Sequence, residues 1–375
     1  MVKIITYSLL LIMGMLVSQV VDLPPLQPHL TNFTMVCLSY IMMEVGLEFV
    51  LDKKNLSSYA TDYMVAMVAA ALPWLLCSMY FYYVVGTELG EALLVGRFAA
   101  PTSAGVLFAM LAAAGLGTTW LFKKARILAI FDDLDTIILM IPLQMMFVGL
   151  RKEAVGLIVL IALSIYLAYR YLHQWKLPLN SRWLLLYSIL VVGFCQLVEN
   201  TIHVQFEVLL PAFVLGAIIY NPHDPKHPER YRHEHAYIEP QREPARYIDY
   251  TIKNSFMFLV GCTIPKLQPH VIDKAPYLIL MHVLLLTILS NIGKLFPTFC
   301  YRKEATLRER FALSVAMFPR GEVGAGVLLV ALEFNLHEHS IALAGMSLAL
   351  NLVLTGFFVL AVLKLNEPYR KHESL

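Results

Sequence analysis

Three aspartates interrupt an apolar stretch of the chain and are its clearest candidates for chemistry. They are Asp132, Asp133 and Asp135, in a run that is otherwise apolar from residue 127 to residue 150. A carboxylate at the centre of a lipid-facing helix costs roughly 3 kcal/mol on an insertion scale, so each needs a cavity or a partner. On a helix Asp132 and Asp135 lie within about 60° of each other, and Asp133 points to a neighbouring face. The cluster predicts a site that binds a cation or protons.

The composition places this cluster in a membrane. Hydrophobic residues make up 58% and charged residues 15% of the 375 residues, and the mean hydropathy is +0.65. These values indicate an all-α polytopic membrane protein. The sequence contains no phosphate-binding loop, nucleophile elbow or zinc signature, so we expect neither an enzyme nor a cofactor.

Twelve apolar segments are long enough to cross a bilayer. They are residues 4–21, 31–50, 60–85, 89–117, 126–150, 153–173, 183–199, 204–220, 248–266, 275–300, 309–333 and 339–364. If the N-terminus is cytoplasmic and the spans alternate, 21 of the 29 lysines and arginines fall on the cytoplasmic side and four on the other. An excess of these residues marks cytoplasmic loops, so both termini are expected in the cytoplasm.

This arrangement predicts one membrane-embedded transporter unit over residues 1–365, in the plasma membrane (the inner membrane of a bacterium). A loop rich in His and Arg over residues 221–247 and a short tail over residues 366–375 are expected in the cytoplasm. The loop is interpreted as a solvated linker, with pH sensing by its histidines as the alternative.

Two apolar segments contain Pro and Gly residues that should break a helix. The first has Pro101 and Gly105, and the second has Pro319, Gly321 and Gly324. Helix breaks are tolerated at membrane depth where the freed backbone lines a cavity or is buried in protein.

The two breaks occupy corresponding positions in the two halves of the chain. Each follows a Val-Gly pair of an earlier span, at distances of 55 and 58 residues. The expected halves are about residues 31–150 and 248–364. The distribution of lysines and arginines indicates that the two halves begin on opposite sides of the membrane. Paired interrupted helices in inverted repeats are the best sequence indication of a transporter binding site near the midplane.

One lysine is expected at the same depth as the aspartates. Asp132 and Asp133 lie six and seven residues beyond Arg126, and Lys294 lies eight residues before Arg302. At 1.5 Å per residue, these positions are about 10 and 12 Å from the same edge of the membrane. An ion pair between Lys294 and one of the aspartates would lower the cost of burying both, and the alternative is that Lys294 reaches back to the interface.

Other polar residues near the breaks are candidates for supporting roles. Thr102 and Ser103 offer hydroxyl oxygens for a cation. Arg320 and Glu322 can pair with each other or cap backbone groups freed by the second break, and the structural role is preferred. Asp135 is either a further ligand or a group that faces water.

Taken together, these motifs resemble a known family over about residues 40–360. The relevant segments are Val45-Gly-Leu-Glu-Phe49, Pro101-Thr-Ser103, Asp132-Asp133, Glu199, Leu210-Pro-Ala-Phe-Val-Leu-Gly216, Gly293-Lys294 and Pro319-Arg-Gly-Glu-Val-Gly324. They are similar to the bacterial sodium/proton antiporters of the monovalent cation:proton antiporter superfamily, of the electrogenic Asp-Asp kind (NhaA/NapA-like).

The resemblance implies an NhaA-type fold of two inverted repeats. It implies a core domain with two crossed, discontinuous helices and a second domain that forms a homodimer. By the same resemblance, Asp133 is the principal ligand for Na⁺ or protons, and Asp132 pairs with Lys294. Asp135 departs from the family pattern, which has an apolar or small residue there.

The function expected from these features is exchange of Na⁺, or of Li⁺, for protons across the lipid bilayer in pH homeostasis. Competition of cation and proton at Asp133 would couple the two movements. One alternative changes the cation to K⁺, and others are a sodium-coupled symporter of an organic anion and a channel or membrane sensor. No nucleic-acid partner is expected.

Overall fold

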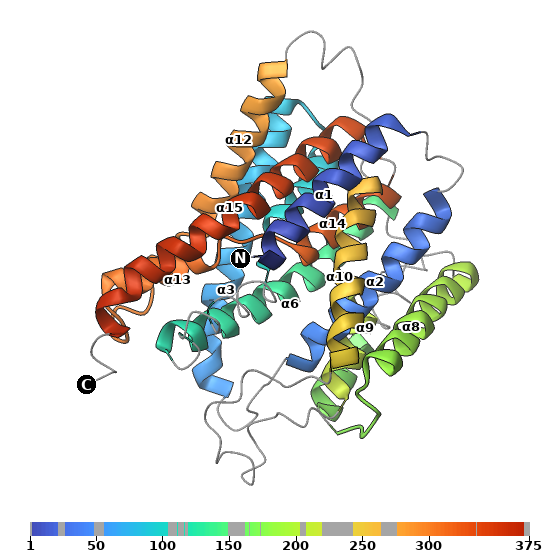
Figure 1. Ribbon diagram of the computed structural model, residues 1–375, viewed down its shortest axis with the longest axis horizontal. Coiled ribbons are helices and arrows are strands. Elements are labelled where there is room, and N and C mark those ends of the chain that lie inside the picture. The colour runs from blue at the N-terminus through green and yellow to red at the C-terminus, as the bar shows by residue number, and fades with distance from the viewer. Residues whose placement is uncertain are drawn as a thin grey trace. The chain divides into compact units, whose positions relative to one another are not determined.

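The computed structural model describes residues 2–21, 27–48, 56–103, 111, 116, 119–148, 162–164, 166–172, 174–202, 208–219, 243–263, 276–334 and 336–370. Within these residues the regular elements are helices, apart from an isolated bridge between Trp175 and Ile219. The prediction of an all-α protein is confirmed. The chain divides into two compact units, whose helices are drawn in Figure 1.

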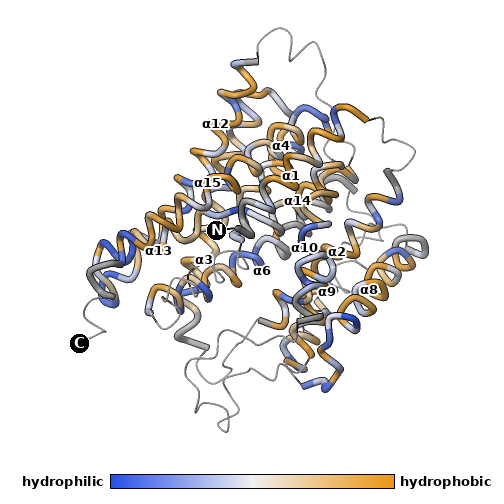
Figure 2. The backbone as a smooth tube through the Cα atoms, in the orientation of Figure 1, coloured by the Kyte–Doolittle hydropathy of each residue, from blue (hydrophilic) through white to orange (hydrophobic). Residues whose placement is uncertain are grey.

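Five of the described helices are long and apolar enough to cross a membrane. These candidate spans are His29–Leu47, Ala60–Val85, Ser181–Val198, Tyr277–Phe299 and Glu338–Asn366. Hydrophobic residues predominate along α8 (Ser181–Ile202), α12 (Pro276–Gly293) and α15 (Glu338–Arg370), which form most of the last three spans (Figure 2).

Unit 1 comprises residues 1–25, 55–143 and 257–375 and contains Asp132, Asp133 and Asp135. Besides α12 and α15, its elements are α1 (Val2–Val20), α3 (Leu56–Tyr80) with the π-helical η2 (Phe81–Val85), α4 (Leu89–Gly96), η3 (Arg97–Ala99), most of α6 (Trp120–Val148), η5 (Phe296–Phe299), α13 (Leu307–Ala316) and α14 (Glu322–Glu333). Helix α15 packs against α1, α12, α13 and α14, and α3 packs against α4 and α12. Figure 1 shows α1, α12 and α15 close together in this unit.

Local sequence explains how the interrupted helices of unit 1 begin and end. Helix α13 begins with a capping box, in which Thr306 accepts a hydrogen bond from the Glu309 N–H and the Glu309 side chain accepts one from the Thr306 N–H. Two helices end where the sequence predicts breaks, α4 with η3 before Pro101 and α13 before Pro319. Proline lacks the N–H that continues a helix, so the chain leaves the helical path there.

Unit 2 comprises residues 26–54 and 144–256. Its helices are α8, α2 (Gln27–Glu48), α9 (Leu209–Ile218) and most of α10 (Glu243–Thr263). Helix α10 begins within the stretch expected to be a loop, because Pro244 in its first turn favours a helix start. Residues 221–242 of that expected loop lie outside the described residues.

Polar contacts join α10 to α2 in unit 2. The Lys253 ammonium lies 2.7 Å from a Glu44 carboxylate oxygen. The Tyr40 hydroxyl donates to Asp249, which also accepts a hydrogen bond from Ser181 at 3.1 Å. Lys253 and Glu44 therefore form an ion pair between α10 and α2.

Helices α2 and α9 approach each other through glycine. A Cβ added at Gly216 would lie 2.2 Å from the Met43 carbonyl oxygen, and one added at Gly46 would lie 2.1 Å from the Phe213 carbonyl oxygen. Both clashes would be with backbone atoms, which cannot rotate away. Small residues at such contacts let the backbones of membrane helices come close.

Replacing Gly216 by alanine should therefore destabilise unit 2. We expect a loss of about 1–3 kcal/mol, because the helices must separate to admit the methyl group. The control is Gly193→Ala in α8 of the same unit, where an added Cβ meets nothing within 4 Å. That change should be neutral or stabilising by about 0.5–1 kcal/mol. Thermal unfolding of the purified variants in detergent measures the difference, and equal midpoints would contradict the prediction.

Candidate ion-binding site

The two broken helices of unit 1 touch at their breaks. The Ser103 N–H donates to the Pro319 carbonyl oxygen at 2.9 Å. A Cβ added at Gly321 would lie 2.5 Å from Ser103 Oγ, a distance that real Cβ atoms essentially never show. Glycine at 321 therefore permits the close approach. A Cβ added at Gly324 would lie 3.0 Å from the Phe98 carbonyl oxygen, and Gly105 is outside the described residues.

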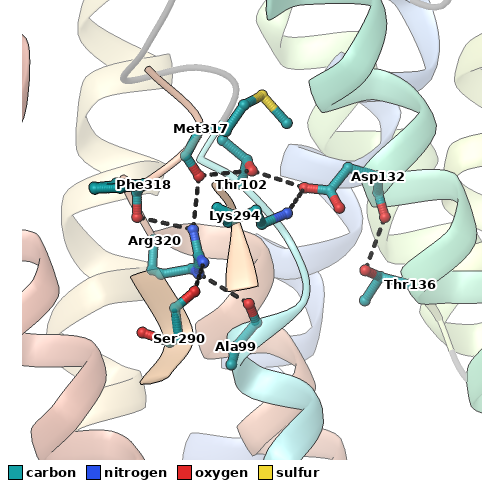
Figure 3. A network of polar contacts seen from close by, with 9 residues as sticks. All are labelled: Ala99, Thr102, Asp132, Thr136, Ser290, Lys294, Met317, Phe318 and Arg320. Carbon is teal, nitrogen blue, oxygen red and sulfur yellow. Dashed lines mark hydrogen bonds and ion pairs between the residues drawn. The ribbon is translucent and has the colours of Figure 1, made fainter. Parts of the chain in front are cut away.

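The guanidinium of Arg320 joins the ends of three helices at this crossing (Figure 3). Its Nε donates to Ala99 O at 3.0 Å, its Nη1 to Met317 O and Phe318 O at 2.8 Å each, and its Nη2 to Ser290 O at 3.0 Å. These carbonyls belong to the last turns of η3 and α12 and to the residues that follow α13. Carbonyls at helix C-termini lack intrahelical donors and carry the negative end of the helix dipole. Arg320 is fully buried and holds the breaks together.

The second break is also held by asparagines. The Arg320 N–H donates to Asn351 Oδ1 at 3.2 Å, and Asn351 Nδ2 donates to Asn291 Oδ1 at 3.0 Å. Of the two roles considered for Arg320, the structure shows the capping of freed backbone groups. The side chain of Glu322 is outside the described residues.

Asp132 lies beside the crossing and is bound to Lys294 (Figure 3). Its Oδ2 accepts a hydrogen bond from Lys294 Nζ at 2.5 Å and another from Thr102 Oγ1 at 2.7 Å. Asp132 and Lys294 are both 0% exposed. The expected ion pair is confirmed, and the alternative in which Lys294 reaches the interface is wrong. Lys294 follows the end of α12 and Thr102 lies in the first break, so three segments of unit 1 meet at one oxygen.

Asp133 follows Asp132 on α6 and is also 0% exposed. It lies near enough to Lys294 for their charges to interact. One ammonium therefore faces two carboxylates, and Arg320, a further buried cation at the crossing, directs its donors to the helix ends. The two aspartates and Lys294 together carry one excess negative charge, which a bound monovalent cation or proton would neutralise.

Asp135 lies one turn further along α6 in a different setting. It is 2% exposed and is hydrogen-bonded by Tyr63 of α3. Arg97, which follows α4, donates to the backbone carbonyls of Asp135 (3.2 Å) and Thr136, and its guanidinium lies 5.2 Å from the ring centre of Trp74. Of the two roles considered for Asp135, facing water is excluded by its burial.

Several of these residues have partners that the sequence does not give. Arg97 stands out as a charged residue inside an apolar segment and needs a partner, but that partner could not be assigned from the sequence. The asparagines at 291 and 351 are polar residues within apolar segments that could have been noticed in the same way. Tyr63 gave no signal, because tyrosine is common at the edges of membrane helices.

A second charged cluster joins α3 and α6 within unit 1, away from the crossing. Asp62 of α3 accepts hydrogen bonds from Lys124 of α6 and from the Tyr301 hydroxyl, both at 2.8 Å. Lys124 also lies 3.2 Å from Glu304. Both carboxylate oxygens of Asp62 accept hydrogen bonds, so we interpret this cluster as structural.

A histidine connects the two interrupted helices at another point in unit 1. His337, between α14 and α15, is hydrogen-bonded to Glu91 of α4. The Glu91 carboxylate raises the pKa of His337 above its ordinary value, first through the hydrogen bond and then through its charge. The side chain of His337 is 73% exposed, so solvent screens the pair and its effect is modest.

This pair should give the fold a pH dependence of defined sign. Because the pKa of His337 is higher in the folded protein than in the unfolded chain, the stabilisation is complete below the ordinary pKa near 6.5 and is lost as the pH rises through the raised value. We expect Glu91→Gln to lower the thermal midpoint in mildly acidic solution and to have a smaller effect in alkaline solution. His337→Gln should reproduce this pattern, and a difference that is independent of pH would contradict it.

Comparison with known proteins agrees with this architecture. The structure resembles that of the sodium proton antiporter MjNhaP1 from Methanocaldococcus jannaschii at pH 8, with a TM-score of 0.64 and 15% sequence identity over 95% of this chain and 92% of that chain. A search of curated proteins finds no match. The family model described as sodium/hydrogen exchanger, transmembrane, matches residues 1–365. With that match over residues 1–365 of 375, the chain belongs to the sodium/hydrogen exchanger family of membrane transporters.

Proposed function

We propose that this protein exchanges Na⁺ for protons, with cation and proton competing at Asp133, and that the exchange is electrogenic. Li⁺ is the second cation that the site would accept. The observation that supports this most directly is the buried Asp132–Asp133 pair beside the crossed breaks, with one ammonium for two carboxylates. A carboxylate in such surroundings binds protons more strongly than in water, and a cation can occupy the same oxygens.

The geometry favours Asp133 over Asp132 as the ligand. Oδ2 of Asp132 already accepts hydrogen bonds from Lys294 and Thr102, so a cation there would have to displace an ammonium group. Asp133 brings a second carboxylate to the same level of α6. The hydroxyls of Thr102 and Ser103 and the carbonyls of the breaks are hard oxygen ligands suited to Na⁺.

The site is built within one unit, which suits alternating access. Residues of α6, the end of α12 and both breaks are joined by buried hydrogen bonds inside unit 1. We propose that unit 1 moves as a rigid body to expose Asp133 to either side in turn, and that the protein works as a homodimer in the plasma membrane with both termini in the cytoplasm. Movement only when the site is occupied would give obligatory exchange.

Inverted membrane vesicles with a pH-sensitive dye test the proposal. Vesicles containing the protein, loaded with protons, should lose their pH gradient when Na⁺ or Li⁺ is added, and vesicles without it should not. An imposed membrane potential should change the rate if exchange is electrogenic. Flux of the cation without proton movement would indicate a channel and would overturn the proposal.

The second candidate function is K⁺/H⁺ exchange by the same site. It retains every contact described above and differs only in the size of the cation that the oxygens around Asp133 accept. Parallel additions of Na⁺, Li⁺ and K⁺ to the vesicles distinguish the two. A sodium-coupled organic-anion symporter is disfavoured, because the buried cluster has three carboxylates that would repel the anion.

A further inference from the structure

One amide side chain of α15 is bound to two parts of the site at once. Asn351 is 1% exposed. Its Oδ1 accepts a hydrogen bond from the Arg320 N–H of the second break at 3.2 Å, and its Nδ2 donates to Asn291 Oδ1 at 3.0 Å. Asn291 lies in the last turn of α12, where its carbonyl oxygen accepts from the Lys294 N–H at 3.1 Å. Asn351 therefore connects the second break with the end of α12 that carries Lys294.

The chemistry of the partners fixes the orientation of both amides. A backbone N–H can only donate, so the atom of Asn351 that faces Arg320 must be the amide oxygen. The amide nitrogen of Asn351 then faces Asn291 and needs an acceptor, which must be the oxygen of that side chain. The two amides therefore form a chain of donors and acceptors with one allowed order, and neither can turn over without losing a hydrogen bond.

The bond to Arg320 also holds a peptide group at the centre of the crossing. The Arg320 N–H and the Pro319 carbonyl belong to one planar trans peptide unit, in which the two groups point in opposite directions. Asn351 accepts from the N–H, and the carbonyl oxygen accepts from the Ser103 N–H at 2.9 Å. This peptide unit is thus held along both edges, by α15 on one side and by the first break on the other. Its orientation determines where Ser103 lies, whose hydroxyl is proposed above as a ligand of the cation.

We propose that Asn351 is a positioning residue that sets the cation preference of the exchanger. Its two hydrogen bonds hold the crossing and Lys294 in one geometry, so the oxygens around Asp133 keep a fixed spacing. A site whose oxygen ligands keep a fixed spacing discriminates between cations by size, and flexibility weakens that discrimination. The proposal rests on the proposed function and deepens it, because it names the residue on which the preference among Na⁺, Li⁺ and K⁺ depends.

The same pair of helices offers a matched control one turn away. Thr287 of α12 and Ser347 of α15 share a hydrogen bond between hydroxyl oxygens 2.9 Å apart, and both residues are buried. Each lies four residues before one of the asparagines, so the two bonds follow one another along the same interface. None of the hydrogen bonds that the structure describes for these two hydroxyls goes to the second break. Ser347→Ala therefore shows what the helix contact alone contributes.

Cation preference in proteoliposomes with a pH dye tests the assignment. The KM and the maximal rate of proton movement are measured for Na⁺, Li⁺ and K⁺, per folded molecule. Loss of a group that orients ligands typically weakens metal affinity by about 10- to 100-fold, so we expect Asn351→Ala to raise the KM of the preferred cation about 10-fold and those of the other cations less. Ser347→Ala should keep the wild-type ratios of KM. Unchanged ratios in Asn351→Ala overturn the proposal, and so does the same change of ratios in Ser347→Ala.

Asn291→Ala provides a second variant if Asn351→Ala does not fold. It removes the bond between the two asparagines and leaves the bond between Asn351 and the Arg320 N–H in place. The ratios of KM should change in the same direction by a smaller factor, since only the Lys294 end of α12 is released. Wild-type ratios in Asn291→Ala would then contradict the proposal.

Failure of the proposed function would give a different pattern. If wild type shows no exchange with any cation, binding is measured instead by the shift of the thermal midpoint of the purified protein, which grows with affinity. Shifts that differ among the cations in wild type and converge in Asn351→Ala support the positioning role without exchange. The same differences in both proteins contradict it, and a wild-type midpoint that no cation shifts overturns both proposals.

Discussion

Asp133→Asn should reduce cation-evoked proton movement in inverted vesicles to the level of vesicles that lack the protein. The amide keeps the size of the side chain and most of its hydrogen-bonding capacity, but it cannot exchange a proton for a cation. Asp133 is fully buried beside the crossing, so water cannot replace the lost carboxylate. The measurement is the dye response after addition of Na⁺, normalised to the amount of folded protein in the membrane.

The control for this loss is Asp62→Asn. Asp62 is another buried acid of unit 1, but it binds Lys124 and Tyr301 in the charged cluster away from the crossing. Its replacement should lower thermal stability and leave exchange per folded molecule near the wild-type value. An undiminished dye response in Asp133→Asn would remove Asp133 from the site. Equal loss in both variants would show that the effect arises from folding.

Lys294→Met should destabilise the protein strongly. The substitution leaves Asp132 buried without its ammonium partner, and breaking a buried ion pair from one side typically costs about 3–5 kcal/mol. Thr102 would still donate to Asp132, and one hydroxyl does not neutralise a charge. Thermal unfolding in detergent should show a large decrease in the midpoint.

The double variant Asp132→Asn with Lys294→Met measures how much the ion pair itself contributes to stability. Because it removes both charges together, it should recover much of the stability lost in Lys294→Met. A double variant as unstable as the sum of the two single changes would show that the ion pair contributes no coupling. That result would contradict a stabilising role for the bond between Lys294 and Asp132.

Local sequence was sufficient to locate the two helix breaks and the buried acids. Proline at 101 and 319 removes a backbone donor, so those segments could not continue as helices. Asp132 and Asp133 are too costly to face lipid, so they had to lie inside the protein. These conclusions depend on single residues and their immediate neighbours, and the structure agrees with each of them. The orientation in the membrane and the ligand role of Asp133 stay predictions.

The sequence by itself thus determined the class of the protein, the level of its buried charges and the two helix breaks, because these follow from local chemistry and short spacings. Only the tertiary structure decided which aspartate binds Lys294, that Arg320 joins three helix ends, and that Tyr63 reaches Asp135. The contacts of Lys294 with Asp132, of Arg320 with Ala99 and of Tyr63 with Asp135 join segments tens to hundreds of residues apart in the chain. Helical periodicity gives the face on which a side chain lies, and only packing determines which distant side chain it meets.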